Sequence, residues 1–255
     1  MLLEEFDESR EAVLQPANFV QPLENMPETV VSCFERGTFE RMLARYGGEQ
    51  IALRAAANME MPVYATTYQG KRLGLFLMDV GAPACAALCE ELYQMGARTI
   101  LLFGSCGVLD SRIGDCSIIV PHAALRDEGT SYHYLPPADE IAVNQAHLDA
   151  FTAMLDQWQV RYTVGKTWTT DGVYRETPAK IARRRAQGCV CVEMECAAAA
   201  AVAQFRGKDF FTFFFAADNL DADEWDPRSL DNAANPTGKD KAAWLAMDFA
   251  AQLSR

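Results

Sequence analysis

Two short runs of the chain are almost entirely apolar, and they constrain the fold more than any other feature. Residues 99–103 read Thr-Ile-Leu-Leu-Phe, and residues 210–217 read Phe-Phe-Thr-Phe-Phe-Phe-Ala-Ala. A strand without alternating polar and apolar residues is typically buried on both faces of its sheet. We therefore expect an α/β protein whose sheet is covered by helices on both sides.

Predicted strands alternate with predicted helices along the chain, which supports this fold class. Further strands are expected at residues 29–34, 62–68, 72–80, 116–120, 162–168 and 190–193. Helices are expected at residues 39–46, 81–95, 146–158, 178–187, 197–205 and 239–253. The prediction is a three-layer αβα fold with a central, mixed and twisted sheet, preceded by an irregular arm over residues 1–25.

Length and composition fit one domain over residues 1–255. Half of the residues are apolar, and the sequence has neither a linker-like tract nor a repeat. The longest apolar runs are too short to span a bilayer, and the first residues lack the order of a signal peptide, so we expect a soluble, cytoplasmic protein. The formal charge of −12 disfavours nucleic acid and anionic membranes as partners.

The cysteines and histidines do not form a pattern that binds metal. Eight cysteines are scattered over a large apolar chain without a secretion signal, which favours reduced thiols. The pairs Cys85/Cys89 and Cys189/Cys191 lack a second pair at zinc-ribbon spacing, and the three histidines are not clustered. We expect neither disulfides nor a bound metal.

Carboxylates follow two of the predicted strands. Glu193-Met194-Glu195 lies where a short strand runs into an alanine-rich helix, and Asp218 follows the strand at 210–217. Polar groups at the carboxyl ends of strands are where α/β proteins bind ligands. The residues alone leave other interpretations open, since acidic side chains also favour helix starts and aspartate also favours turns.

Gly104-Ser105-Cys106-Gly107 directly follows the buried strand at 99–103. We expect a glycine loop there, whose backbone amides and hydroxyl suit an anion or a hydroxyl-rich ligand. A tight turn without a ligand would use the same glycines. The spacing matches neither a dinucleotide fingerprint nor a Walker loop.

Seven motifs in this order resemble those of the purine and uridine phosphorylases, a family that also includes the methylthioadenosine/S-adenosylhomocysteine nucleosidases. The resemblance covers residues 29–250. It is carried by Gly81-Ala82-Pro83, Arg98-Thr99 with Gly104-Ser105-Cys106-Gly107, Gly114-Asp115, Arg126 with Gly129 and Ser131, Thr170-Asp171 with Tyr174, Glu193-Met194-Glu195, and Asp218.

The resemblance implies cleavage of the N-glycosidic bond of a nucleoside. Glu195 would hold the 2′ and 3′ hydroxyls of the ribose with Met194 below the sugar, and Asp218 would be the general acid that protonates N7 of a purine. Glu193 would line the base side or orient the loop. The remaining substrate-binding residues would be Ser105, Cys106, Gly107, Val173 and Tyr174.

The co-substrate implied by the resemblance is inorganic phosphate, with no organic cofactor. Gly37, Arg41 and Ser105 are the candidate phosphate ligands, with Arg36 as an alternative to Arg41, but Leu102 stands where the family has a second arginine. No cationic side chain lies between residues 59 and 65, where a third falls. The nucleosidases use water, oriented by an early glutamate such as Glu35 or Glu40.

We therefore rank a phosphorylase first, a nucleosidase second and a non-catalytic nucleoside-binding protein third. The glutamine and arginine that hold uracil in uridine phosphorylases have no counterpart after Tyr174, where the chain reads Arg-Glu-Thr-Pro. That absence, together with Asp218, favours a purine. The resemblance also implies a homo-oligomer, either a dimer or a hexamer built from dimers.

Overall fold

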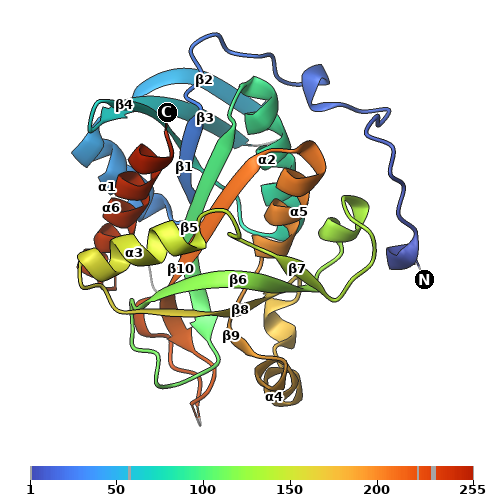
Figure 1. Ribbon diagram of the computed structural model, residues 1–255, viewed down its shortest axis with the longest axis vertical. Coiled ribbons are helices and arrows are strands. Elements are labelled where there is room, and N and C mark those ends of the chain that lie inside the picture. Colours follow the sequence, from blue (N-terminus) through green and yellow to red (C-terminus); the bar gives the residue numbers. More distant parts are fainter. Residues whose placement is uncertain (1, 57–58, 223, 231–233, 255) are drawn as a thin grey trace.

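The computed structural model describes residues 2–56, 59–222, 224–230 and 234–254. Its centre is a ten-stranded mixed sheet with helices on both faces, so the predicted αβα fold is confirmed (Figure 1). Among the helices of the described residues, none is long and apolar enough to cross a membrane.

The strands occupy most positions expected from the apolar pattern. They are β1 (Thr29–Cys33), β2 (Glu49–Ala56), β3 (Met59–Tyr68), β4 (Lys71–Leu77), β5 (Thr99–Val108), β6 (Ile118–Asp127), β7 (Glu140–Ala142), β8 (Tyr162–Thr170), β9 (Cys189–Glu193) and β10 (Asp209–Asn219). The α-helices are α1 (Arg36–Tyr46), α2 (Ala82–Met95), α3 (Leu148–Gln157), α4 (Pro178–Ala186), α5 (Cys196–Arg206) and α6 (Pro236–Leu253).

The sheet is partly closed on itself around β5. This strand runs parallel to both β1 and β10, and its last residues pair antiparallel with β9. The path β10-β6-β8-β9 returns to β5, so five strands form a closed ring, while β1, β4, β3 and β2 extend as an open sheet. The carboxyl ends of β5, β9 and β10 consequently lie together.

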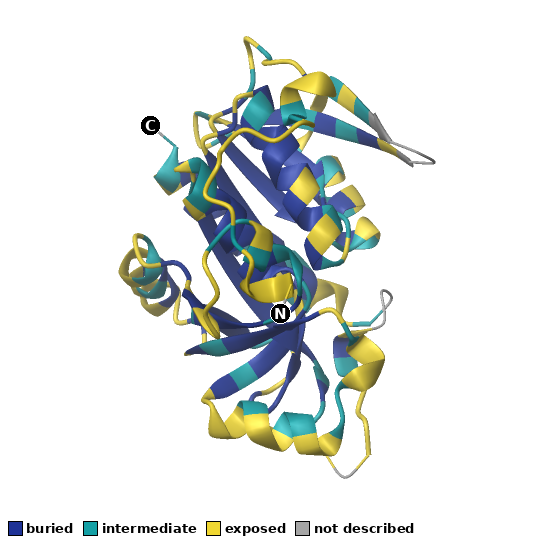
Figure 2. Cartoon of the chain, turned by 90° about the vertical axis from the view of Figure 1, so that its right-hand side faces the viewer, coloured by how far each residue is buried: buried dark blue, intermediate teal, exposed yellow. Residues whose placement is uncertain are grey.

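Helices cover the two faces with different side chains. Alanines of α5 and small residues of α2 form one apolar cluster with Ile100 and Leu102 of β5. Leu101 and Phe103, the alternate residues of β5, join a second cluster with α1, α3 and α6. Figure 2 shows the resulting pattern, in which the strands are buried and the outer helix faces are exposed.

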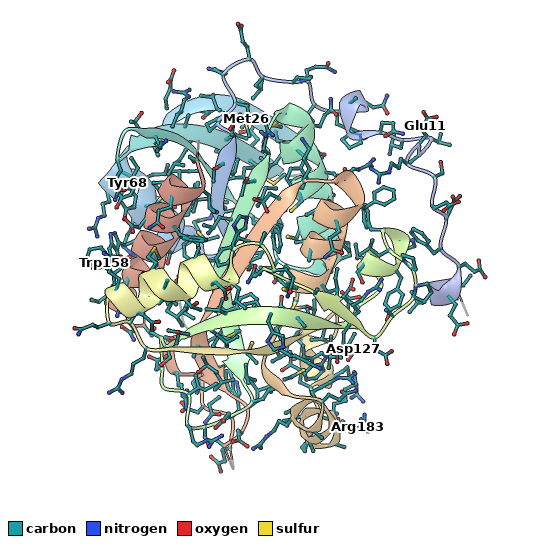
Figure 3. All side chains as sticks on the ribbon, viewed as in Figure 1. Glu11, Met26, Tyr68, Asp127, Trp158 and Arg183 are labelled. Carbon is teal, nitrogen blue, oxygen red and sulfur yellow. The ribbon has the colours of Figure 1, made fainter. Side chains whose placement is uncertain are left out.

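The first residues form an irregular arm with two short 3-10 turns, η1 (Leu2–Glu4) and η2 (Pro16–Asn18). The arm follows the surface, with Glu11 at the periphery in Figure 3. It is fixed near α2 by a hydrogen bond from the Leu23 amide to the Met95 carbonyl, at 2.9 Å.

The prediction of a glycine loop is wrong, because β5 continues through Gly104-Ser105-Cys106-Gly107 and pairs with β10 over these residues. The glycines serve close packing. A Cβ on Gly104 would lie 2.7 Å from the Phe34 ring, and one on Gly107 would lie 2.4 Å from Leu220. The edge strand β2 and the short β7, which the sequence did not indicate, carry weaker apolar patterns.

Candidate active site

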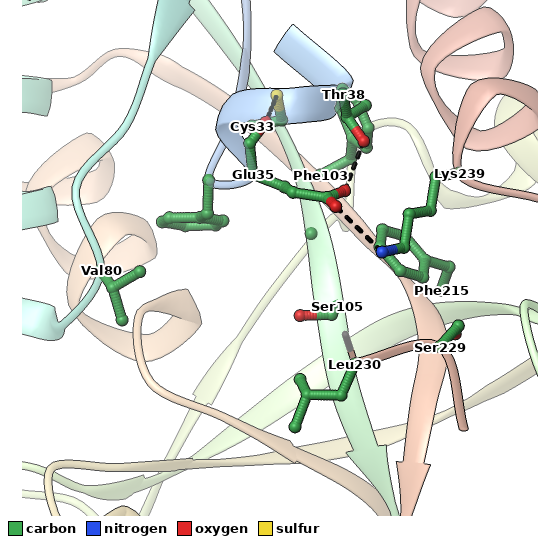
Figure 4. A pocket seen from close by; sticks show the side chains of 12 residues that line it. Cys33, Glu35, Thr38, Val80, Phe103, Ser105, Phe215, Ser229, Leu230 and Lys239 are labelled. Atoms are coloured by element: carbon green, nitrogen blue, oxygen red, sulfur yellow. Dashed lines mark hydrogen bonds and ion pairs between the residues drawn. The ribbon is translucent and has the colours of Figure 1, made fainter. Parts of the chain in front are cut away.

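Two adjoining cavities lie where β5, β9 and β10 end. The carboxylate cavity, about 270 Å³, is lined by Gly107, Glu193, Met194, Glu195 and Asp218 among others. The lysine cavity, about 190 Å³, is lined by Glu35, Thr38, Ser229 and Lys239 among others (Figure 4). Both cavities share the lining residues Phe34, Val80, Ser105 and Leu230, so Ser105 stands at their boundary.

Glu193 is a buried carboxylate that organises the start of α5. Its Oε1 accepts hydrogen bonds from the hydroxyls of Thr167 and Thr169, at 3.1 and 2.6 Å. Its Oε2 accepts from the backbone amides of Glu195 and Cys196, at 2.8 and 2.7 Å. Burial raises the pKa of Glu193 although these hydrogen bonds oppose the shift. The geometry fits the expectation that Glu193 orients the loop.

Glu195 is held in one orientation at the edge of the carboxylate cavity. Its Oε1 accepts a hydrogen bond from the Gly81 amide at 2.6 Å, and its Oε2 accepts one from the Met194 amide at 3.3 Å. Burial, and then the charge of Glu193, raise the pKa of Glu195 to about 8. A fixed carboxyl group with lone pairs left over suits the recognition of two sugar hydroxyls.

Asp218 lies near the end of β10, beside a register shift, and pairs with Gly107 of β5. The indole of Trp225 donates a hydrogen bond to Asp218 Oδ2 at 2.8 Å. Burial raises the pKa of Asp218, while the Trp225 hydrogen bond opposes the shift. A general acid must still hold its proton at the pH of the reaction, and a raised pKa of the aspartic acid allows this.

A fourth carboxyl group, Glu176, lines the same cavity and was not selected from the sequence. It follows the 3-10 turn η4 (Val173–Arg175), which directs neighbouring side chains to different sides. Val173 lines the cavity, whereas Tyr174 is 95% exposed and lines neither cavity, so the geometry does not place Tyr174 against the base. Burial, and then Asp218, raise the pKa of Glu176 to about 7.

The raised pKa of Glu176 predicts a pH-dependent gain in stability for Glu176→Gln. Between its ordinary pKa of 4.5 and about 7, the folded protein holds a proton that the unfolded chain releases, so ionisation weakens folding as pH rises. The partly exposed site should limit this loss to roughly 1 kcal/mol. Urea unfolding at pH 4 and pH 8 should therefore show that the variant gains relative to wild type only at the higher pH. Equal differences at both pH values, or the same gain in the exposed control Glu24→Gln, would contradict the assignment.

The lysine cavity contains a buried ion pair. Lys239, whose side chain is 2% exposed, donates a hydrogen bond to Glu35 Oε1 at 2.9 Å, and the Thr38 hydroxyl donates to Glu35 Oε2. Figure 4 shows both donors directed at Glu35. Within the described part of the chain, Lys239 is the one cationic side chain that lines either cavity.

Lys239 was missed although the sequence contains a signal for it. With Ala242, Ala243 and Ala246 it lies on the buried stripe of α6. A lysine on the apolar face of a helix is rare unless a partner compensates its charge.

Neither Gly37 nor Arg41, the expected phosphate ligands, lines a cavity. Helix α1 begins at Arg36, which places Gly37 in its first turn and Arg41 one turn further. The Arg41 guanidinium donates to Asp240 at 2.6 Å and to the Thr38 hydroxyl at 3.0 Å. Arg54, the nearest cation to the expected third position, is paired with Glu91 at 2.5 Å.

The structure brings together residues that are far apart in the sequence. One cavity gathers Ser105, Cys106, Gly107, Val173, Glu193, Met194, Glu195 and Asp218. In the described residues, no three histidine, cysteine or acidic side chains are grouped so that they could hold a metal ion. The arrangement is therefore a concave site whose boundary serine separates a carboxyl-rich end from an end that holds a lysine.

The fold is that of the nucleoside phosphorylases. A uridine phosphorylase structure from Vibrio fischeri superposes with a TM-score of 0.77 at 22% identity, over 95% of this chain and 99% of that one. A purine nucleoside phosphorylase from Toxoplasma gondii gives a TM-score of 0.75 at 19% identity, over 92% and 98% of the two chains.

Residues 31–248 match the family model described as "Phosphorylase superfamily", and the chain belongs to that family. A DeoD-type purine nucleoside phosphorylase from Colwellia psychrerythraea is 28% identical over 63% of this chain and 70% of its own length. A guanosine phosphorylase from Halorubrum lacusprofundi is 27% identical over 60% of this chain and 63% of its own length.

A uridine phosphorylase from Thermococcus kodakarensis is 31% identical over 48% of this chain. The matched segment spans only 44% of that relative's own length.

Proposed function

We propose that the protein is a nucleoside phosphorylase that acts on a purine nucleoside. An oxygen of inorganic phosphate forms a bond to C1′ of the pentose while the bond from C1′ to the base nitrogen breaks. The departing base takes a proton from Asp218, and the products are the free base and a pentose 1-phosphate. No organic cofactor takes part.

One observation carries the proposal: Glu195 and Asp218 line the same cavity as Ser105, and that serine also lines a second, adjoining cavity. A nucleoside placed with its hydroxyls at Glu195 and its base at Asp218 leaves the lysine cavity for an acceptor. Bond exchange at C1′ needs this order of acceptor, sugar and leaving base.

Two features support a purine base. Asp218 is a carboxyl group whose pKa is raised by burial, and a purine offers the basic N7 to such a donor whereas uracil has no corresponding ring nitrogen. The purine and guanosine phosphorylases among the relatives agree with this choice. We further propose that the enzyme acts in the cytoplasm as a homo-oligomer, either a dimer or a hexamer built from dimers.

An assay of base release from adenosine, guanosine, inosine and uridine, each with and without phosphate, tests the proposal. We expect release from purine nucleosides that depends on phosphate and yields a pentose 1-phosphate. Equal release without phosphate, giving free pentose, would show a nucleosidase. Binding of nucleosides without turnover under either condition would show a binding protein.

A further inference from the structure

We propose that the Glu35–Lys239 pair is the acceptor subsite and that it selects an oxyanion that still carries a hydroxyl hydrogen. Phosphate fits this description at neutral pH, whereas sulfate, which is fully deprotonated, does not. The inference rests on the proposed phosphorylase function, whose acceptor end it defines.

The position of the pair suits an acceptor. Glu35, Lys239 and Ser105 line one cavity, and Ser105 also lines the cavity that holds Glu195 and Asp218. In Figure 4, the Ser105 hydroxyl lies below the Glu35–Lys239 ion pair. An anion held by Lys239 is thus separated from the sugar site only by the shared wall residues.

The pair offers an anion both a hydrogen-bond donor and a hydrogen-bond acceptor. The Lys239 ammonium is a hydrogen-bond donor, and the Glu35 carboxylate is an acceptor whose two oxygens offer about four lone-pair positions. Lys239 and Thr38 each occupy one of these positions, on different oxygens. Glu35 can therefore accept one more hydrogen bond, which the hydroxyl of a phosphate anion supplies.

The same carboxylate disfavours an anion without a hydroxyl. A sulfate oxygen placed against Glu35 would face a negative charge without a hydrogen between them, and such a repulsive element produces specificity. An arginine-rich site would lack this discrimination, but Arg41 and Arg54 are bound to Asp240 and Glu91 outside both cavities. Lys239 together with Glu35 adds no net charge, so hydrogen-bond complementarity decides which anion binds.

Competition between the two oxyanions tests the inference. With the full-length protein at constant ionic strength, set with chloride, we expect sulfate to inhibit phosphate-dependent base release with a Ki at least tenfold above the KM for phosphate. Glu35→Gln replaces an acceptor oxygen with an amide donor, and we expect it to lower the Ki for sulfate at least tenfold. Glu49→Gln, an exposed change at the start of β2, should leave both constants unchanged.

A substitution of Lys239 alone would leave the Glu35 charge buried and unpaired, so Lys239 is tested together with Glu35. The double variant Glu35→Gln/Lys239→Met removes both charges, and we expect its KM for phosphate to rise at least tenfold while the affinity for nucleoside is kept. Calorimetric titration of phosphate and of sulfate repeats the comparison without turnover, and circular dichroism shows whether each variant is folded.

The outcomes separate the two proposals. Wild-type protein that binds sulfate as tightly as phosphate, or a Glu35→Gln variant without gain in sulfate affinity, overturns the acceptor subsite while phosphate-dependent turnover stands. Base release that ignores phosphate overturns the proposed function, and the titrations then decide the oxyanion preference independently.

Discussion

Replacing Asp218 with asparagine is expected to lower kcat/KM for guanosine or adenosine by about 10²- to 10⁴-fold, the usual contribution of a positioned general acid. Asparagine keeps the size of the side chain and can still accept the Trp225 hydrogen bond, but it has no proton to give to the departing base. Steady-state kinetics at saturating phosphate measures the loss.

A substrate that needs no proton provides the control. A purine nucleoside methylated at N7 already carries the positive charge that Asp218 would supply, so its cleavage should fall less than tenfold in Asp218→Asn. Asp149→Asn, an exposed change at the start of α3, should retain wild-type rates with both substrates. If the methylated and unmethylated nucleosides lose activity equally, Asp218 has a different role.

Replacing Glu195 with glutamine is expected to cost about 10²- to 10³-fold in kcat/KM. Above pH 8, where Glu195 is ionised, the change replaces two charge-assisted hydrogen bonds to the sugar, each worth roughly 1.5 to 3 kcal/mol, with weaker neutral ones. It should not unfold the protein, because the amide oxygen of glutamine can still accept from Gly81. The paired measurements are turnover and urea unfolding across pH.

The two measurements should move in opposite directions. Since burial raises the pKa of Glu195 to about 8, the wild-type protein loses stability as pH rises from its ordinary pKa of 4.5 towards 8, and the glutamine variant is spared this loss. Substrates that lack one sugar hydroxyl should lose less activity in the variant than the complete nucleoside. A variant that is unstable at every pH, with the same relative loss for all substrates, would point to a packing role instead.

The sequence alone predicts the sheet and the carboxylate end of the site. Long apolar strands such as β10 are easily recognised, because a strand buried on both faces has few polar residues. Glu193, Glu195 and Asp218 were predicted because they interrupt or follow such strands at the end where ligands bind. In the structure, Glu193 accepts hydrogen bonds from backbone amides at the start of α5, and such contacts cannot be read from a sequence.

The lysine end of the site depended on long-range geometry. Lys239 and Glu35 are 204 residues apart in the chain, and the packing of α6 beside α1 and β1 brings them together. Arg41 keeps the spacing expected of a phosphate ligand, but one turn of helix directs it to Asp240. Glu176 likewise gains its position from a single 3-10 turn, whose direction is not encoded in a motif.

The position of β5, shared between the closed ring of strands and the open sheet, has a consequence for motion. Ser105 and Gly107 are two residues apart on this strand, and each successive residue advances the backbone by about 3.3 Å. In the proposed function, the interval between the acceptor and the base is thus set by a segment that is hydrogen-bonded to β10 and, at Gly107, to β9. Whatever opens to admit a nucleoside, these two sides of the reacting carbon should keep their spacing.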